Sequence, residues 1–110
     1  MAGSDLYTGT LELLVLKALS WGPMHGYAIN KWIRERTGDT VIVAEGSLYP
    51  ALHRLEKRGL LHEEWGVTDR NREAKYYSLS TEGRAHLRAE TARFTAHANT
   101  VAGILALRRA

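Results

Sequence analysis

Hydrophobic residues recur at helical spacing in four segments of the chain, and the first segment covers residues 8–20. Thr8 is a typical N-terminal capping residue, and the leucines and valine that follow it point in nearly every direction around a helix. A helix that is apolar all round must be covered on both sides. We expect the domain core to cover one side and another element, such as a second subunit contacting Leu11 and Leu14, to cover the other.

A second helix is predicted for residues 25–37, between the break at residues 21–23 and a natural stop at Gly38. Residues 40–43 are β-branched but few, so we interpret them as a brief extended connector. The second helix has a charged outer face and one apolar stripe, which consists of Ala28, Ile29, Trp32 and Ile33.

A third helix is predicted for residues 47–58, with Ser47 as its N-cap and Gly59 as its stop. Pro50 then falls in the first turn, where the backbone N–H groups have no acceptor within the helix and proline loses nothing. Leucines and an alanine form the side that faces the core. The opposite side is aromatic and basic, which is typical of a helix that reads a groove of DNA. It carries Tyr49, Pro50, His53, Arg54 and Lys57.

Residues 60–65 and 74–79 predict the two strands of a β-hairpin with a loose polar tip over residues 69–72. Ser80 or Thr81 then caps a last helix that extends to about Leu107. Apolar positions along this helix form a narrow seam that requires another helix as its partner. We expect a dimer interface there, and the seam consists of Leu87, Thr91, Phe94, Ala98, Val101 and Leu105.

Three helices followed by a hairpin is the order of elements in a winged helix-turn-helix, whose third helix enters the major groove. We therefore predict a mainly α fold with a small β-hairpin. Its winged-helix domain covers residues 1–80, and a long C-terminal dimerisation helix covers residues 81–110.

Composition narrows the class of protein. The chain has 110 residues, enough for one domain with a modest core, and it contains no cysteine. Its N-terminus lacks a secretory pattern and its apolar runs are too short to cross a bilayer, so we expect a cytoplasmic protein without membrane contact. The net charge of +3 permits a polyanionic partner. Residues 47–75 carry six basic and five acidic side chains, so the DNA hypothesis depends on where those charges lie.

The sequence contains no motif typical of a metal site or an enzyme active site. None of the five histidines has another histidine three or four residues away, and there is no thiol, so no metal is expected. The chain has no nucleophile elbow, no glycine-rich phosphate loop and no paired carboxylates. We expect neither enzymatic activity nor a cofactor.

Three stretches of sequence sharpen the winged-helix prediction. Gly26-Tyr27, the run from Gly46 to Leu61 that contains Leu-Tyr-Pro and Arg-Leu-Glu, and the run from Ala74 to Gly83 closely resemble the PadR family of transcription regulators. The resemblance covers roughly Leu6 to Arg84, and the single short C-terminal helix is similar to the compact subfamily. It implies a cytoplasmic homodimer that binds a palindromic operator, usually represses, and is released by a small molecule or another signal.

Two departures from the family pattern concern the expected DNA contacts. Ser47 stands where the family often has threonine, which retains the hydroxyl group. Family wings often carry a basic cluster before the Lys-Tyr-Tyr motif, whereas this chain has Arg72-Glu73-Ala74, which predicts weaker contact between the wing and phosphates.

The predicted DNA contacts come from the third helix and the hairpin tip. They are Ser47, Tyr49, Pro50, His53, Arg54, Lys57, Arg70, Asn71, Arg72 and Lys75. Alternatives remain open: Ser47 as a cap alone, Tyr49 packed on the wing or the second helix, and the charged side chains as a solvated surface.

Aromatic side chains suggest a site for a small-molecule effector, and its candidate contacts are Trp21, Trp65 and Phe94, while Trp32 belongs to the core. For Phe94, packing in the seam is the more common explanation of such a residue. The alternative function for the whole chain is a winged-helix module that binds another protein and not DNA.

Overall fold

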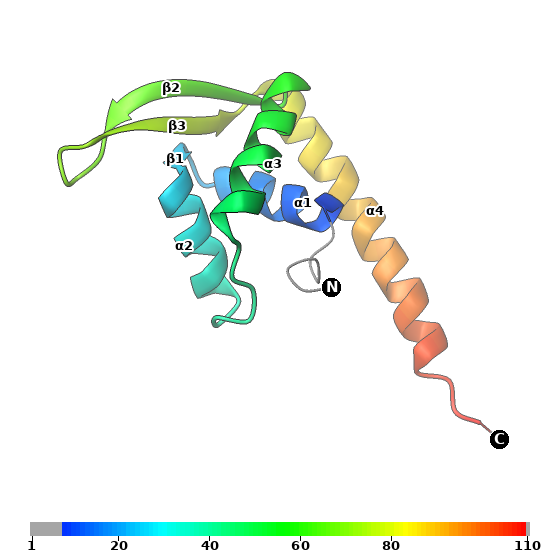
Figure 1. The fold of residues 1–110 in the computed structure, drawn as a ribbon. Coiled ribbons are helices and arrows are strands. Elements are labelled where there is room, and N and C mark those ends of the chain that lie inside the picture. Colours follow the sequence, from blue (N-terminus) through cyan, green and yellow to red (C-terminus); the bar gives the residue numbers. More distant parts are fainter. Residues whose placement is uncertain (1–7, 110) are drawn as a thin grey trace.

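The computed structural model describes residues 8–109 and contains four helices and a small three-stranded antiparallel sheet (Figure 1). This arrangement confirms the predicted winged helix-turn-helix with a long C-terminal helix. In chain order the elements are α1 (Thr8–Leu19), β1 (Met24–His25), α2 (Gly26–Arg36), α3 (Glu45–Lys57), β2 (Leu61–Val67), β3 (Glu73–Leu79) and α4 (Thr81–Leu105).

The core lies where α1 meets the inner faces of α2, α3 and the first turns of α4. Apolar residues of α3 recur three and four positions apart, so that Leu48, Leu52 and Leu55 share one face and are completely buried. Val15 and Leu16 of α1 are equally buried against them. The hydrophobic face of each helix is thus covered by the others, which supplies most of the stability of such short helices.

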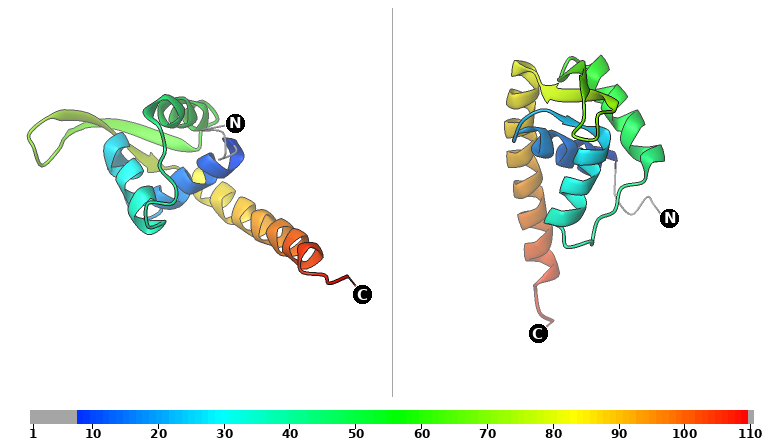
Figure 2. Two further views of the ribbon diagram at one scale, coloured as in Figure 1. Left: turned by 60° about the horizontal axis from the view of Figure 1, so that its bottom comes forward. Right: turned by 90° about the vertical axis from the view of Figure 1, so that its left-hand side faces the viewer.

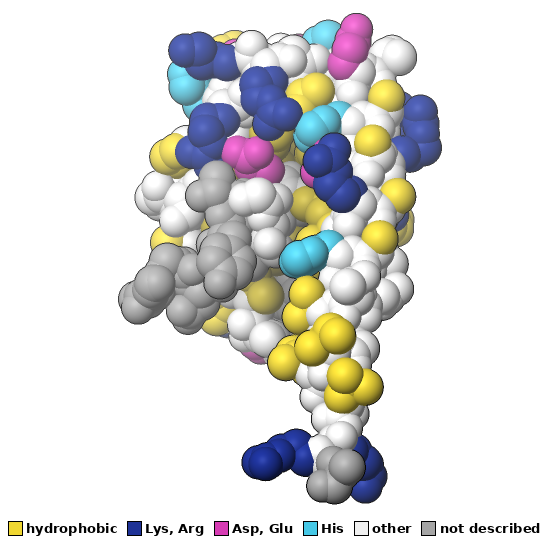
Figure 3. All heavy atoms as spheres, turned by 90° about the vertical axis from the view of Figure 1, so that its right-hand side faces the viewer, with side chains coloured by type: hydrophobic (Ala, Val, Ile, Leu, Met, Phe, Trp, Pro, Cys, Tyr) yellow, Lys and Arg dark blue, Asp and Glu magenta, His cyan; other side chains and the backbone are white. Residues whose placement is uncertain are grey.

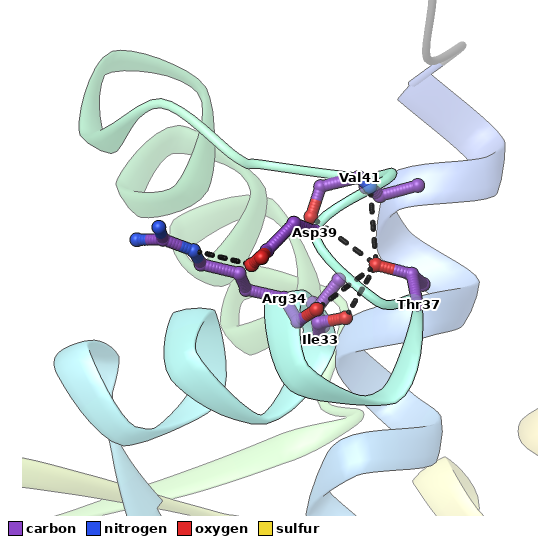
Figure 4. A network of polar contacts seen from close by, with 5 residues as sticks. All are labelled: Ile33, Arg34, Thr37, Asp39 and Val41. Carbon is purple, nitrogen blue, oxygen red and sulfur yellow. Dashed lines mark hydrogen bonds and ion pairs between the residues drawn. The ribbon is translucent and has the colours of Figure 1, made fainter.

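A network of hydrogen bonds ends α2 and orders the connector that follows it (Figure 4). The Thr37 hydroxyl donates to the carbonyl of Ile33 at 2.9 Å and accepts from the N–H of Val41 at 3.0 Å. Arg34 forms an ion pair with Asp39 at 2.8 Å. The predicted extended connector is confirmed, and it reaches α3 without forming a strand.

The start of α3 differs from the prediction. The helix begins at Glu45, and its N-cap is Ala44, whose carbonyl accepts from the N–H groups of Ser47 and Leu48 at 2.9 and 3.0 Å. The prediction of Ser47 as the N-cap is therefore wrong. Pro50 lies in the second turn, where it removes an N–H that would otherwise bond to the carbonyl of Gly46. An alanine cap forms no side-chain hydrogen bond and leaves no signal in the sequence.

The hairpin, hereafter the wing, is longer and better ordered than predicted. Its strands pair from Leu61 opposite Leu79 to Val67 opposite Glu73. The Thr68 hydroxyl accepts from the N–H groups of Arg70 and Arg72, both at 3.2 Å, so the tip is a hydrogen-bonded turn and not a loose loop. The two-residue strand β1, which the sequence pattern did not predict, pairs with the other edge of β3.

Helix α4 begins at a capping residue that the sequence identified correctly. The buried Ser80 hydroxyl accepts from the N–H of Gly83 at 2.9 Å and donates to the carbonyl of Gly59 at 2.7 Å. Gly83 lies against Leu60, and a Cβ at position 83 would overlap the Leu60 carbonyl oxygen. From this junction α4 extends well beyond the body of the domain (Figure 2). Within residues 8–109 no helix is both long and apolar enough to cross a membrane.

Replacement of the two serines tests both helix starts. We expect Ser80→Ala to lower the free energy of unfolding by about 1–2 kcal/mol, because it leaves the buried N–H of Gly83 without its capping partner and removes the bond to the Gly59 carbonyl. Ser47→Ala, at an exposed position in α3, is the matched control and should cost less than about 0.5 kcal/mol. Urea unfolding followed by circular dichroism measures both, and equal losses would contradict the assignment of the caps.

Candidate nucleic-acid interface

A groove of about 790 Å³ lies between the start of α2, the exposed side of α3 and the wing. In Figure 1 the wing and α2 extend from the same side of α3. Side chains from all three elements line it, and they include Tyr27, Lys31, Tyr49, Arg70, Arg72, Lys75 and Tyr77. Asp69 and Glu73 also line the groove, but basic side chains outnumber them, and a mostly basic wall with aromatic rings suits a polyanion with apolar edges.

Tyr49 lies over Gly26, and this contact sets the separation of α2 and α3 at the groove. A Cβ at position 26 would lie 2.5 Å from the Tyr49 hydroxyl oxygen and 2.8 Å from its Cζ atom. Tyr49 is nevertheless 46% exposed, so its remaining surface faces the groove. Packing on the second helix and availability to a ligand, which the sequence left as alternatives, therefore coexist.

The other predicted positions of α3 separate into two groups. Ser47, Pro50, His53 and Lys57 are exposed on the side of the helix away from the core. Arg54 differs, because its Nε lies 2.8 Å from a carboxylate oxygen of Glu12 in α1. Its charge is thus directed toward another helix, and a DNA contact by Arg54 would compete with this ion pair.

The wing supplies three cations near the groove. Arg70 and Arg72 are exposed at the tip and line the groove, with Asn71 between them in a left-handed conformation at φ 62°. Lys75 lies 2.7 Å from Glu63, and this hydrogen bond raises the pKa of Lys75 above its ordinary value. Burial raises the pKa of Tyr77, which keeps its hydroxyl protonated at the base of the groove.

Sequence reasoning missed the contribution of α2. His25 caps this helix by accepting from the N–H of Ala28 at 3.2 Å, and its ring stacks near Tyr27 with a centroid distance of 6.3 Å. Tyr27 is 72% exposed and lines the groove together with Lys31 one turn later. The sequence did offer one indication, the glycine Gly26 between the aromatic side chains of His25 and Tyr27. A glycine in such a place allows the backbone to approach a neighbouring element closely.

The three candidate effector contacts lie on different elements. Trp21 packs on Trp32 at the end of α1, with 5.4 Å between ring centroids, and Trp65 is on the wing. Phe94 lines a separate hollow of about 430 Å³ between α1 and α4, which neither Trp21 nor Trp65 reaches. A single protomer therefore does not bring the three together. Trp32 packs against the core, as expected.

Comparisons with known proteins agree with this geometry. Residues 15–89 match the family described as the transcriptional regulator PadR-like family. The chain is 33% identical to a PadR family transcriptional regulator from Eggerthella lenta, with a TM-score of 0.80 and coverage of 94% of this chain and 88% of that one. A transcriptional regulator from Clostridium thermocellum gives 27% identity and a TM-score of 0.81, with coverage of 91% and 94%. An uncharacterized protein of Lysinibacillus sphaericus is 30% identical over 79% of this chain and 80% of its own length.

The contact between Gly26 and Tyr49 can be tested by a double-mutant cycle. We expect Gly26→Ala to lower the free energy of unfolding by about 1–3 kcal/mol, because the new methyl group overlaps the tyrosine ring. In a Tyr49→Ala background this cost should largely disappear. Gly46→Ala is the control, since nothing lies within 4 Å of a Cβ there. Strictly additive losses, measured by urea unfolding, would show that the two residues do not constrain each other.

Proposed function

Since the chain belongs to the PadR-like family of transcriptional regulators, we propose that it is a homodimeric repressor that binds a palindromic DNA operator and is released by an effector. DNA-binding transcription regulation follows from the family. The observation that carries the finer proposal is the convergence of Tyr49, Arg70 and Arg72 on one groove beside the exposed side of α3. In this arrangement α3 enters the major groove while the cations of the wing contact phosphates beside it.

Helix α4 supports the homodimer. Its first turns bury Gly83 and Leu87 in the core of the protomer, where Leu11 of α1 is also buried. Beyond them the predicted seam lies open, with Phe94 48%, Val101 41% and Leu105 79% exposed. Figure 3 shows hydrophobic side chains gathered along α4 toward its C-terminal end. A projecting helix of this kind is marginal in water unless a partner covers its apolar side, and a second copy of α4 is suited to do so.

A two-fold dimer places two copies of α3 on one side of the assembly. Two recognition helices about one turn of DNA apart, roughly 34 Å, read two half-sites of a palindrome in successive major grooves. An operator of this kind at the gene's own promoter would exclude RNA polymerase and repress transcription.

The effector belongs in the hollow beside Phe94. Its lining combines the apolar Leu13, Leu16 and Phe94 with two ion pairs, Arg58 with Glu12 and Arg93 with Glu90. Because the hollow is bounded by α1 and α4, a ligand there would change how the two protomers pack and thereby the separation of the two α3 helices.

The alternative function, a winged-helix module that binds protein, is favoured only by the nearly balanced charge of residues 47–75. A stable protein partner together with no affinity for DNA at low salt would establish it in place of the repressor.

Binding to the DNA directly upstream of the coding region tests the proposed function. We expect gel shifts to show a specific complex whose affinity falls steeply with salt. Tyr49→Ala should weaken it about tenfold, and Lys57→Ala should reduce the slope of log K against log salt by about 0.9, as expected for one lost phosphate contact. Lys17→Ala is the control, because Lys17 lies over Trp21 at the far end of α1. An absence of binding at low salt would refute the proposal.

The dimer can be tested independently of DNA. We expect Val101→Asp combined with Leu105→Asp to convert the protein to a monomer in sedimentation velocity, because two charges would be buried in the proposed interface. Asn99→Asp adds a charge to the same helix outside the seam and should leave the dimer intact. A wild-type chain that sediments as a monomer would contradict the interface.

A further inference from the structure

Trp65 lies on the side of the wing that faces the helices, yet 67% of it is exposed. The strand register places Leu61, Glu63, Trp65 and Val67 on one face of β2. At the base of the wing Leu61 is buried in the core, so this face is turned toward the helices. Farther out the same face continues as Trp65 and Val67, and no described element of the protomer covers them.

The opposite face of the wing is closed by its own side chains. The ring of Tyr76 lies over Gly66, where a Cβ would approach the ring to 2.9 Å, and its hydroxyl donates to the carbonyl of Val67 at 3.3 Å. His25 packs edge-on against the same ring at 5.3 Å. The chain therefore covers apolar surface on one face of the wing and leaves a tryptophan uncovered on the other. Folding of the protomer does not account for that difference.

The neighbours of Trp65 indicate what covers it. The Lys75 ammonium group lies 5.7 Å from the centre of the Trp65 ring, and Lys75 lines the groove with Arg70 and Arg72. Trp65 therefore borders the groove proposed to hold DNA. Because Glu63 pairs with Lys75, the local charge beside the ring is nearly balanced, and the ring offers an apolar surface. Between successive phosphates a DNA strand presents the apolar edges of its deoxyribose rings.

We propose that Trp65, together with Val67, packs against deoxyribose rings along the minor groove of the duplex that α3 contacts. This inference rests on the proposed DNA-binding function and extends it. Arg70 and Arg72 hold the phosphates, and Trp65 supplies an apolar contact that excludes water from the sugar edge. The contact gives the wing affinity that does not depend on a basic cluster before Lys75. It also gives Trp65 a role different from the effector contact expected from the sequence.

Salt dependence separates an apolar contact from an ionic one. With a labelled duplex of the upstream region, we expect Trp65→Ala to raise the dissociation constant about tenfold at every KCl concentration. The slope of log K against log salt should stay unchanged. Trp65→Phe should retain most of the affinity. Arg72→Gln should lower the slope by about 0.9. Trp21→Ala removes another exposed tryptophan that does not line the groove and should bind as the wild type does.

Fluorescence reports the contact directly. The double variant Trp21→Phe and Trp32→Phe leaves Trp65 as the only tryptophan, and saturation with the duplex should shift its emission to shorter wavelength and protect it from acrylamide. Unchanged emission, or wild-type affinity of Trp65→Ala, would overturn the inference while leaving the DNA-binding proposal intact. A wild-type chain that binds no duplex at low salt would overturn both. A change of emission with planar aromatic compounds but not with DNA would assign Trp65 to an effector site instead.

Discussion

The close approach of α2 and α3 at Gly26 and Tyr49 is the constraint on which the groove depends. A Cβ at position 26 would overlap the tyrosine ring where it now lies, so glycine allows the ring to rest directly on the start of α2. The contact holds one side of the ring and leaves the other facing the groove. A side chain fixed in this way loses little further rotational freedom on binding, which favours a specific contact over a diffuse one.

A second junction relates this groove to the rest of the protein. The Leu60 carbonyl, just after α3, accepts from the N–H of Ser80 at 3.0 Å, and Gly83 packs against the same group. The end of α3, the base of the wing and the start of α4 are thereby joined within a few residues. If α4 carries the dimer contact, the junction transmits the relative position of the two protomers to the two copies of α3. The ion pair between Glu12 and Arg54 adds a link from α1 to α3.

Most of the fold could be predicted because each helix and strand has a periodic apolar pattern. The start of α3 could not, because Ala44 caps through its backbone alone while Ser47 and Pro50 imitate a helix start three residues later. Strand β1 could not be predicted either, since two residues carry no period and their pairing depends on β3. In the candidate nucleic-acid interface, the contributions of the exposed side of α3 and of the wing tip could be predicted from their residue types. The contribution of Tyr27, and the ion pair that occupies Arg54, depend on contacts between distant segments.

The central claim is that two copies of this chain present α3 and the wing to one duplex. Hydroxyl-radical footprinting of the upstream DNA with the wild-type protein tests it most directly. We expect two equivalent protected regions related by a two-fold axis and separated by about one helical turn, with minor-groove protection flanking each where the wings lie. A single protected region, or protection without symmetry, would contradict it.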